Sequence, residues 1–260
     1  MILFENVSKI FTSLDGATIT AFKEISLEVK QGEFVSIVGP SGCGKTTLLG
    51  IISGLIKPTH GQVLVNQQSV NGRFGWAGYM TQADTLLPWR TVWGNTEIGL
   101  EINGMPKTER QKKVTKLISQ VGLNGFENKY PFEISGGMKK RLDLIRTLAY
   151  DPDVLLLDEP FAALDCQTRE FLQADLLRLW EDYKKTIIFV THDLVEAITL
   201  SDRIFLMTSR PGTIKKEYRV PLSRPRSTFD LQLTEDFYEF HKQIRIDLKE
   251  EVSRPSRCIE

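Results

Sequence analysis

The chain has 260 residues, of which 41% are hydrophobic and 25% charged, values that exclude a disordered, fibrous or collagen-like protein. Lysine and arginine together number 33, as do aspartate and glutamate, so there is no overall basic charge to attract nucleic acid or a membrane surface. Three cysteines without CxxC spacing suggest neither a disulfide framework nor a zinc site, and they fit a reducing cytosol. We expect neither a membrane span, because no apolar run nears about 20 residues, nor a secretion signal.

The first 80 residues favour strands and one helix. Residues 2–7 and 25–29 favour short strands, and the apolar run 34–38 favours a buried one. A glycine-rich loop follows, and the apolar residues of 46–52 then recur at helical spacing. Short strands and turns over 61–79 favour antiparallel pairing, so we expect an N-terminal antiparallel β subdomain.

A helical insertion is expected next, at about residues 88–150, and strands and helices alternate after it. The predicted strands are 154–157, 186–190 and 203–208, and the predicted helices between them are 168–184 and 194–200. Parallel neighbours need a crossover connection, so this alternation implies βαβ units. The predicted fold class is α/β with a mostly parallel sheet.

The C-terminal region is expected to contain a linker over 221–227 and then a helix. The arginines in and around the linker are expected to be solvated: Arg219, Arg224 and Arg226. Thr234 is a candidate helix cap, and apolar residues from Phe237 to Val252 fall on one helical face. We expect this helix to be a packing element and assign it no function.

A phosphate-binding loop is predicted between the strand 34–38 and the helix that follows it. The segment from Gly39 to Thr46 matches the pattern GxxxxGK(S/T), and its glycines let backbone N–H groups converge on phosphate oxygens. Lys45 would reach the β- and γ-phosphates, and the Thr46 hydroxyl would ligate magnesium. The residues predicted to hold the nucleotide here are Gly39, Pro40, Ser41, Gly42, Cys43, Gly44, Lys45, Thr46 and Thr47.

Two adjacent carboxylates follow the apolar strand 154–157. Asp158 would hold magnesium, directly or through water, and Glu159 would polarise the water that attacks the γ-phosphate. Adjacent acids at a strand end often form only a solvated turn. Ligands sit at the carboxyl ends of parallel strands, so the phosphate loop beside them favours the catalytic interpretation.

The segment Ile134-Ser135-Gly136-Gly137-Met138 lies 23 residues before Asp158. It resembles the signature of the ATP-binding cassette family, usually LSGGQ, with Ile and Met replacing the first and last residues. A hydroxyl and bare N–H groups at a helix N-terminus suit a second phosphate-binding surface. The signature residues predicted to contact nucleotide are Ser135, Gly136 and Gly137.

The resemblance implies roles for further residues. Gln82 resembles the glutamine of the family's Q-loop, which contacts magnesium and the attacking water. His192 resembles the switch histidine that contacts the γ-phosphate, and Phe11 falls where an aromatic ring stacks on adenine. Ala163-Leu164-Asp165 resembles the D-loop. Taken singly, each of these residues could have a purely structural role. Their order and spacing in the sequence argue against that interpretation.

Several segments narrow the resemblance to the ATPase subunits of nitrate, sulfonate, taurine and bicarbonate importers. These segments include Leu86-Leu87-Pro88-Trp89, Asp158-Glu159-Pro160-Phe161 and Ser209-Arg210-Pro211-Gly212. Lys139-Lys140-Arg141 departs from the usual Arg-Gln-Arg of these relatives, and Asp143 replaces a small residue. Both departures lie near the interface that the resemblance predicts between two cassettes.

The resemblance covers about residues 2–225 and implies an ATPase domain built on a phosphate-loop core, with 226–260 as a C-terminal helical extension. It implies ATP and Mg²⁺ as ligands, a head-to-tail homodimer that shares each ATP site, and a place at the cytoplasmic face of the cell membrane. It also implies separate permease subunits and a periplasmic or lipid-anchored solute-binding protein, and no nucleic acid. The permease would dock near Leu87, Pro88, Trp89 and Trp93, unless the two tryptophans pack the core.

Other functions remain possible from the sequence. An ATPase of an export complex would share every catalytic motif. A soluble cassette ATPase acting on nucleic acid or ribosomes usually carries two cassettes or coiled-coil insertions, which this sequence lacks. A small-molecule kinase would leave the signature segment and His192 without a role.

Overall fold

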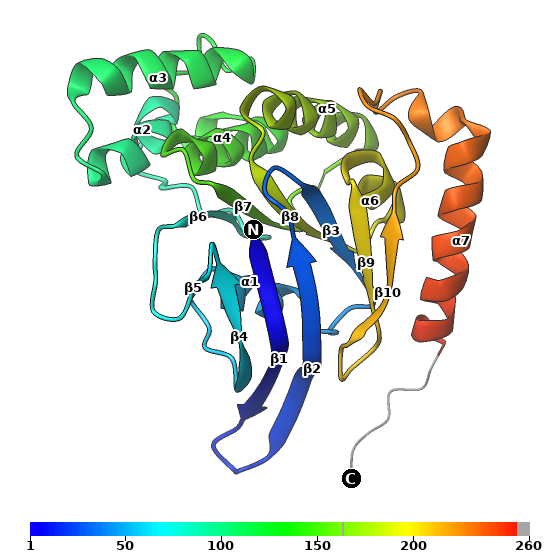
Figure 1. The fold of residues 1–260 in the computed structure, drawn as a ribbon. Coiled ribbons are helices and arrows are strands. Elements are labelled where there is room, and N and C mark those ends of the chain that lie inside the picture. The colour runs from blue at the N-terminus through cyan, green and yellow to red at the C-terminus, as the bar shows by residue number, and fades with distance from the viewer. Residues whose placement is uncertain (163, 254–260) are drawn as a thin grey trace.

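The structure is a computed structural model that describes residues 1–162 and 164–253, and it contains two β-sheets (Figure 1). The antiparallel sheet has the order β2-β1-β4-β5, with β1 at Ile2–Thr12, β2 at Thr18–Val29, β4 at His60–Val65 and β5 at Gln68–Ser69. The N-terminal antiparallel subdomain is therefore confirmed. β1 and β2 are longer than predicted. The register between them shifts repeatedly, and such bulges interrupt the alternation of apolar and polar residues from which a strand is predicted.

The second sheet is parallel except at one edge. Its order is β10-β9-β3-β8-β7-β6, with β3 at Phe34–Val38, β6 at Ala77–Met80, β7 at Val154–Asp158, β8 at Thr186–Thr191, β9 at Arg203–Met207 and β10 at Ile214–Arg219. Only β10 runs antiparallel to its neighbour. The antiparallel interpretation of residues 61–79 is wrong for β6, which pairs in parallel with β7. The helical insertion between β6 and β7 supplies the crossover that parallel pairing requires.

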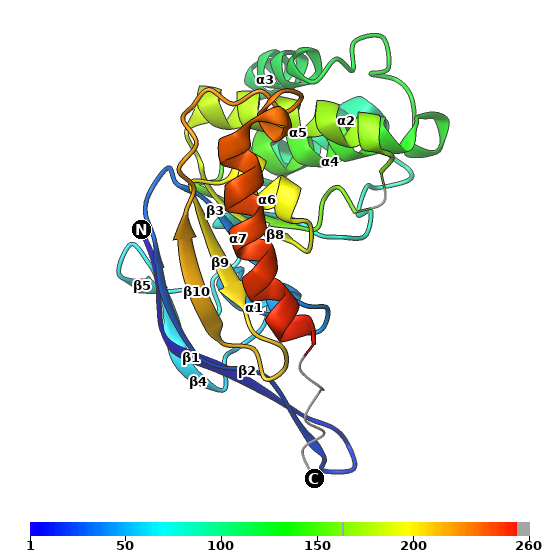
Figure 2. The same ribbon diagram turned by 90° about the vertical axis from the view of Figure 1, so that its right-hand side faces the viewer.

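The helices cover both faces of the parallel sheet (Figures 1 and 2). They are α1 at Lys45–Ile52, α2 at Val92–Ile102, α3 at Lys107–Gln120, α4 at Gly136–Ala149, α5 at Cys166–Tyr183, α6 at Leu194–Leu200 and α7 at Glu235–Val252, with short 3-10 turns at Pro131–Glu133 and Leu231–Leu233. α1 packs between the two sheets, where its apolar side chains join a buried cluster with residues of both. A second cluster lies among α2 to α5, and it joins the helical insertion to apolar residues of β3, β7 and β8.

The C-terminal region differs from the sequence-based expectation. Arg226 is buried, and its guanidinium donates to the carbonyls of Ile198, Thr199 and Ser201 at the end of α6. Arg224 pairs with Asp202. Helix C-termini leave carbonyls without partners, and these arginines satisfy them, so the expectation of solvated side chains is wrong for both. Arg219 is exposed.

The predicted final helix is confirmed as α7, and Thr234 Oγ1 accepts a hydrogen bond from the N–H of Phe237, 3.3 Å away. α7 packs along α6 and β10 (Figures 1 and 2). The last seven residues of the expected C-terminal extension, 254–260, lie outside the described residues, as does Cys258.

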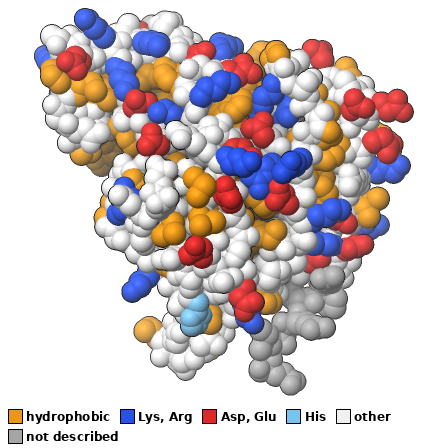
Figure 3. All heavy atoms as spheres, in the orientation of Figure 1, with side chains coloured by type: hydrophobic (Ala, Val, Ile, Leu, Met, Phe, Trp, Pro, Cys, Tyr) orange, Lys and Arg blue, Asp and Glu red, His pale blue; other side chains and the backbone are white. Residues whose placement is uncertain are grey.

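Charged side chains of both signs are interspersed over the face drawn in Figure 3, as the equal numbers of acidic and basic residues suggest. Within residues 1–162 and 164–253, no helix combines the length and hydropathy that crossing a membrane requires.

Candidate functional site

A cavity of about 370 Å³ opens between the phosphate loop, the first hairpin and the carboxyl end of β7. Its lining residues are Phe11, Ile19, Ala21, Ser41, Gly42, Gly44, Lys45, Thr46, Thr47, Gln82, Glu159 and Arg210. The fold thus brings the predicted phosphate loop together with Phe11, Gln82 and Glu159, although they come from four separate elements. Phe11 is 42% exposed, so its ring is available to a ligand.

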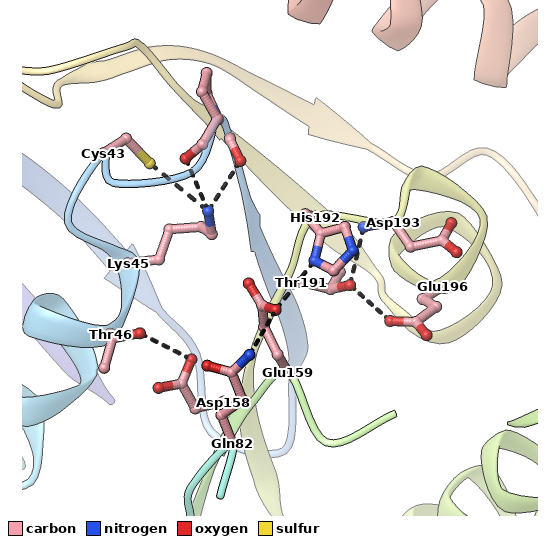
Figure 4. Close-up of polar contacts among 12 residues, drawn as sticks. Cys43, Lys45, Thr46, Gln82, Asp158, Glu159, Thr191, His192, Asp193 and Glu196 are labelled. Carbon is pink, nitrogen blue, oxygen red and sulfur yellow. Dashed lines mark hydrogen bonds and ion pairs between the residues drawn. The ribbon is translucent and has the colours of Figure 1, made fainter. Parts of the chain in front are cut away.

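The phosphate loop joins β3 to α1, and its backbone needs glycine. Gly42 and Gly44 have φ of 76° and 100°, and a Cβ at Gly44 would lie 2.9 Å from Phe22 Cδ1. Lys45 is buried, and its ammonium donates to the carbonyl of Gly39 at 2.9 Å and to that of Pro40 at 3.0 Å (Figure 4). The N-terminus of α1 and this ammonium together form an anion site. Cys43 lies buried beneath it, and burial raises the pKa of its thiol.

An oxygen-rich pair borders the phosphate loop. Thr46 Oγ1 donates to Asp158 Oδ1 at 3.2 Å. Burial raises the pKa of Asp158, and the nearby charge of Glu159 raises it further, whereas the Thr46 hydrogen bond lowers it. Burial also raises the pKa of the neighbouring Tyr79 to about 12. A hydroxyl and one carboxylate beside an anion site are the ligands that Mg²⁺ uses when phosphate oxygens complete its shell, so these residues fit that ion.

Three predicted catalytic side chains converge at the end of β7 (Figure 4). Glu159 Oε2 lies 3.0 Å from His192 Nδ1 and 3.4 Å from Gln82 Nε2. Glu159 has φ of 44°, a left-handed conformation uncommon for residues other than glycine, and its N–H donates to the Val190 carbonyl. Strained backbone of this kind is frequent at active sites, and here it aims the carboxylate into the cavity.

Glu196 was not predicted from the sequence, and it lies behind His192. It is 4% exposed, and it accepts a hydrogen bond from Thr191 Oγ1 at 2.6 Å. Burial raises its pKa to about 7. Arg169 pairs with Glu196 and donates to the carbonyl of Leu164 in the expected D-loop, so one ionic cluster joins the D-loop to the region behind His192. A glutamate in the first turn of a helix carries no sequence signal of which way it faces.

Arg210 and Gly212 were noted only as part of a subfamily segment. The Arg210 guanidinium donates to the Gly42 carbonyl through Nε at 3.2 Å and Nη2 at 3.1 Å, and it lines the cavity. A Cβ at Gly212 would lie 2.2 Å from the Cys43 carbonyl oxygen. The segment Ser209–Gly212 therefore packs directly against the phosphate loop and supports it.

The signature residues do not line this cavity. Ser135 caps α4 and accepts a hydrogen bond from the N–H of Met138 at 3.3 Å. A Cβ at Gly136 would meet nothing within 4 Å, whereas one at Gly137 would lie 2.6 Å from Thr168 Cγ2. The signature therefore borders the start of α5 and leaves an open glycine surface. Ala163, the first residue of the expected D-loop, lies outside the described residues.

The family model described as ABC transporter matches residues 22–162. An uncharacterised ABC transporter ATP-binding protein of Methanocaldococcus jannaschii is 49% identical over 95% of this chain and 91% of its own length. The chain belongs to the ABC transporter family.

Other relatives of this ABC protein extend the comparison. A taurine import ATP-binding protein of Roseobacter denitrificans is 42% identical over 91% of this chain and 86% of its own length. The dimeric structure of an ATP-binding cassette in a post-hydrolysis state, bound to ADP and Pi, superimposes with a TM-score of 0.76. It is 33% identical and covers 86% of this chain and 100% of its own. The expected α/β cassette fold of this ABC protein is thus confirmed.

Proposed function

We propose that this chain is the ATP-hydrolysing subunit of an importer that takes up a small oxyanion or organosulfonate through separate permease subunits. The observation that carries the proposal is a cavity walled by a phosphate loop, Gln82 and Glu159, with His192 3.0 Å from Glu159. The chain is also 42% identical to a taurine import protein over most of both lengths. The family's fold would also serve an exporter or a soluble ATPase acting on nucleic acid. The import proteins among its relatives favour the importer.

The cavity supports a division of labour in ATP hydrolysis. Lys45 and the loop N–H groups would bind the β- and γ-phosphates, and Phe11 would stack on adenine. Thr46, Asp158 and Gln82 would hold Mg²⁺, which supplies charge stabilisation to the transferring phosphoryl group. Glu159 would take a proton from the attacking water, and His192, 3.0 Å from it, would orient that carboxylate toward the γ-phosphate.

The exposed signature supports a shared site. Ser135, Gly136 and Gly137 carry N–H groups at the start of α4, yet they do not line the cavity of their own chain. In a head-to-tail homodimer they would close over the nucleotide held by the partner's phosphate loop. The dimeric arrangement of the ADP-bound relative supports this geometry.

A permease would dock beside Gln82. Trp89 is 71% exposed, and the buried amide of Asn95 holds the preceding loop by exchanging hydrogen bonds with the backbone of Leu87. An exposed tryptophan beside a backbone held in this way suits contact with an apolar surface of a partner. Trp93 instead packs against the helical core, so we leave it out of the docking surface. A solute-binding protein would deliver the substrate, and the complex would place this chain at the cytoplasmic face of the membrane.

The Glu159→Gln variant tests the ATPase mechanism. We expect hydrolysis about 10²- to 10⁴-fold slower than wild type, because a general base contributes about that much, and accumulation of an ATP-bound dimer. Size-exclusion chromatography with light scattering, in ATP and Mg²⁺, measures the dimer. A variant that stays monomeric and hydrolyses ATP at the wild-type rate would refute the assignment of Glu159 as the base.

Uptake tests the importer proposal. Proteoliposomes would hold this chain with the permease encoded beside its gene, together with the corresponding solute-binding protein. We expect ATP-dependent accumulation of taurine, another sulfonate, nitrate or bicarbonate. ATP-dependent movement of a solute from the compartment that holds ATP and this chain into the compartment that holds the solute-binding protein would instead indicate export.

A further inference from the structure

Lys140 on α4 contacts the segment that carries Gln82. We call residues 82–85 the Q-loop segment. The Lys140 ammonium donates to the Gln82 carbonyl at 3.2 Å and pairs with Asp84 Oδ1 at 2.8 Å. Its side chain is 7% exposed, whereas that of Asp84 is 49% exposed. One buried cation on the signature helix therefore holds the backbone of the residue predicted to touch magnesium and water.

Asp143 holds the next part of the Q-loop segment through Arg146. The Arg146 guanidinium donates to the carbonyl and the hydroxyl of Thr85, and it pairs with Asp143 Oδ1 at 2.6 Å. Asp143 is fully buried, and its Oδ2 has no hydrogen-bond partner among the described residues. The Asp143 carboxylate orients the Arg146 guanidinium, which makes two hydrogen bonds to Thr85. Asp143 therefore helps to position Thr85 without contacting it.

The four charges of this cluster balance. Lys140 and Arg146 carry two positive charges, and Asp84 and Asp143 carry two negative charges. Burial raises the pKa of Asp143, the charges of Arg146 and Lys140 lower it, and the charge of Asp84 raises it. Removing Lys140 alone would leave Asp84 and Asp143 to repel each other across the contact. Removing Asp143 alone would leave an excess positive charge and a poorly oriented Arg146.

Two departures from the family pattern coincide with this cluster. In the family that the sequence resembles, a glutamine and a small residue are usual at these positions, so Lys140 adds a positive charge and Asp143 a negative one. Each change by itself would unbalance the contact, and together they leave its net charge unchanged. The two substitutions are thus electrostatically matched, which neither departure indicates alone.

We infer that Lys140 and Asp143 are coupled positioning residues, which fasten the Q-loop segment to the signature helix so that Gln82 stays beside Glu159. This inference rests on the proposed ATPase function. Gln82 Nε2 lies 3.4 Å from Glu159 Oε2, and the carbonyl of the same residue is held by Lys140. The signature and the Q-loop segment consequently move as one body when two cassettes close or separate.

A double-mutant cycle tests the coupling. The variants are Lys140→Gln and Asp143→Ala, which restore the family's usual residue types, and the combination of both. We expect each single variant to lower kcat at least about 5-fold with little change in KM for ATP, and the combination to lose clearly less than the product of the two single losses. Lys112→Gln on α3, an exposed lysine of the same helical insertion, is the matched charge control and should leave kcat unchanged.

Three outcomes would overturn the inference that Lys140 and Asp143 act together through Gln82. Additive losses in the double variant, or losses that merely follow a lower melting temperature, would overturn the inference. In a Gln82→Ala background the two substitutions should have no further effect on kcat, because they act through Gln82, and a persistent effect would also overturn it. Asp143→Asn replaces Asp143→Ala should the latter fail to fold. If the wild-type chain itself does not hydrolyse ATP, the proposed function fails, which is a separate result.

Discussion

Gly212→Ala should disable nucleotide binding without replacing any residue that is predicted to contact the nucleotide. The backbone at Gly212 is tied to the first hairpin, since its N–H donates to the Ala21 carbonyl and its carbonyl accepts from Lys23. A new Cβ would lie 2.2 Å from the Cys43 carbonyl oxygen, whereas ordinary contact begins near 3.4 Å. The phosphate loop must therefore move by about 1 Å, because the new Cβ at Gly212 meets the backbone of Cys43 and not a flexible side chain.

The size of the effect follows from the displaced loop. A misplacement of about 1 Å commonly costs about 100-fold in a site built on close geometry. ATP at 100 times its wild-type Kd stabilises the folded chain by about 2.7 kcal/mol, and after a 100-fold loss of affinity the same ATP stabilises it by only about 0.4 kcal/mol. The strain itself should lower the stability of the nucleotide-free chain by about 1–3 kcal/mol.

Urea unfolding with and without ATP and Mg²⁺ measures both quantities. Gly94→Ala is the control, because it adds a methyl inside α2, where the nearest atom is the side-chain Arg90 Cβ at 3.3 Å. That variant should keep the ATP-induced stabilisation and gain about 0.5–1 kcal/mol from lower unfolded-state entropy. If Gly212→Ala retains wild-type stability and wild-type stabilisation by ATP, the close packing of the segment Ser209–Gly212 against the phosphate loop is refuted.

Three further predictions concern residues that the structure singles out. Because burial raises the folded-state pKa of Glu196 from 4.5 to about 7, the folded chain holds a proton that the unfolded chain releases, and stability falls as pH rises across that window. Glu196→Gln should thus gain up to about 3 kcal/mol relative to wild type between pH 5 and pH 8 in urea unfolding, and a constant difference would contradict the shift. Arg226→Met should cost about 3–5 kcal/mol, since it leaves the α6 carbonyls buried without donors, while the exposed Arg219→Met should change stability by less than about 0.5 kcal/mol. Arg210→Ala should weaken ATP binding about 5- to 10-fold in a fluorescent-nucleotide titration, with Arg210→Lys intermediate, because the Gly42 carbonyl loses two charged donors; equal affinities would exclude that role.

Local chemistry determined the parts of the protein that the sequence predicted. The phosphate loop requires glycines and a lysine at set spacing, because the backbone itself binds phosphate, so those residues are recognisable without a fold. β3, β7 and β8 are short apolar runs, and their positions were predicted to within one residue. The Thr234 cap of α7 is likewise a contact between near neighbours in sequence.

Only the tertiary structure decided the contacts that join distant segments. β6 belongs to the parallel sheet because β7 follows it through the helical insertion, a pairing that no local pattern marks. Arg226 is a buried helix-end donor because the end of α6 happens to lie beneath it. Lys140 and Asp143 read as unexplained departures in the sequence, and their opposite charges gain a meaning only where α4 meets the Q-loop segment. The type of a side chain determines which interactions it can make. Long-range packing determines which partner is present, and burial then sets how much each interaction contributes to stability.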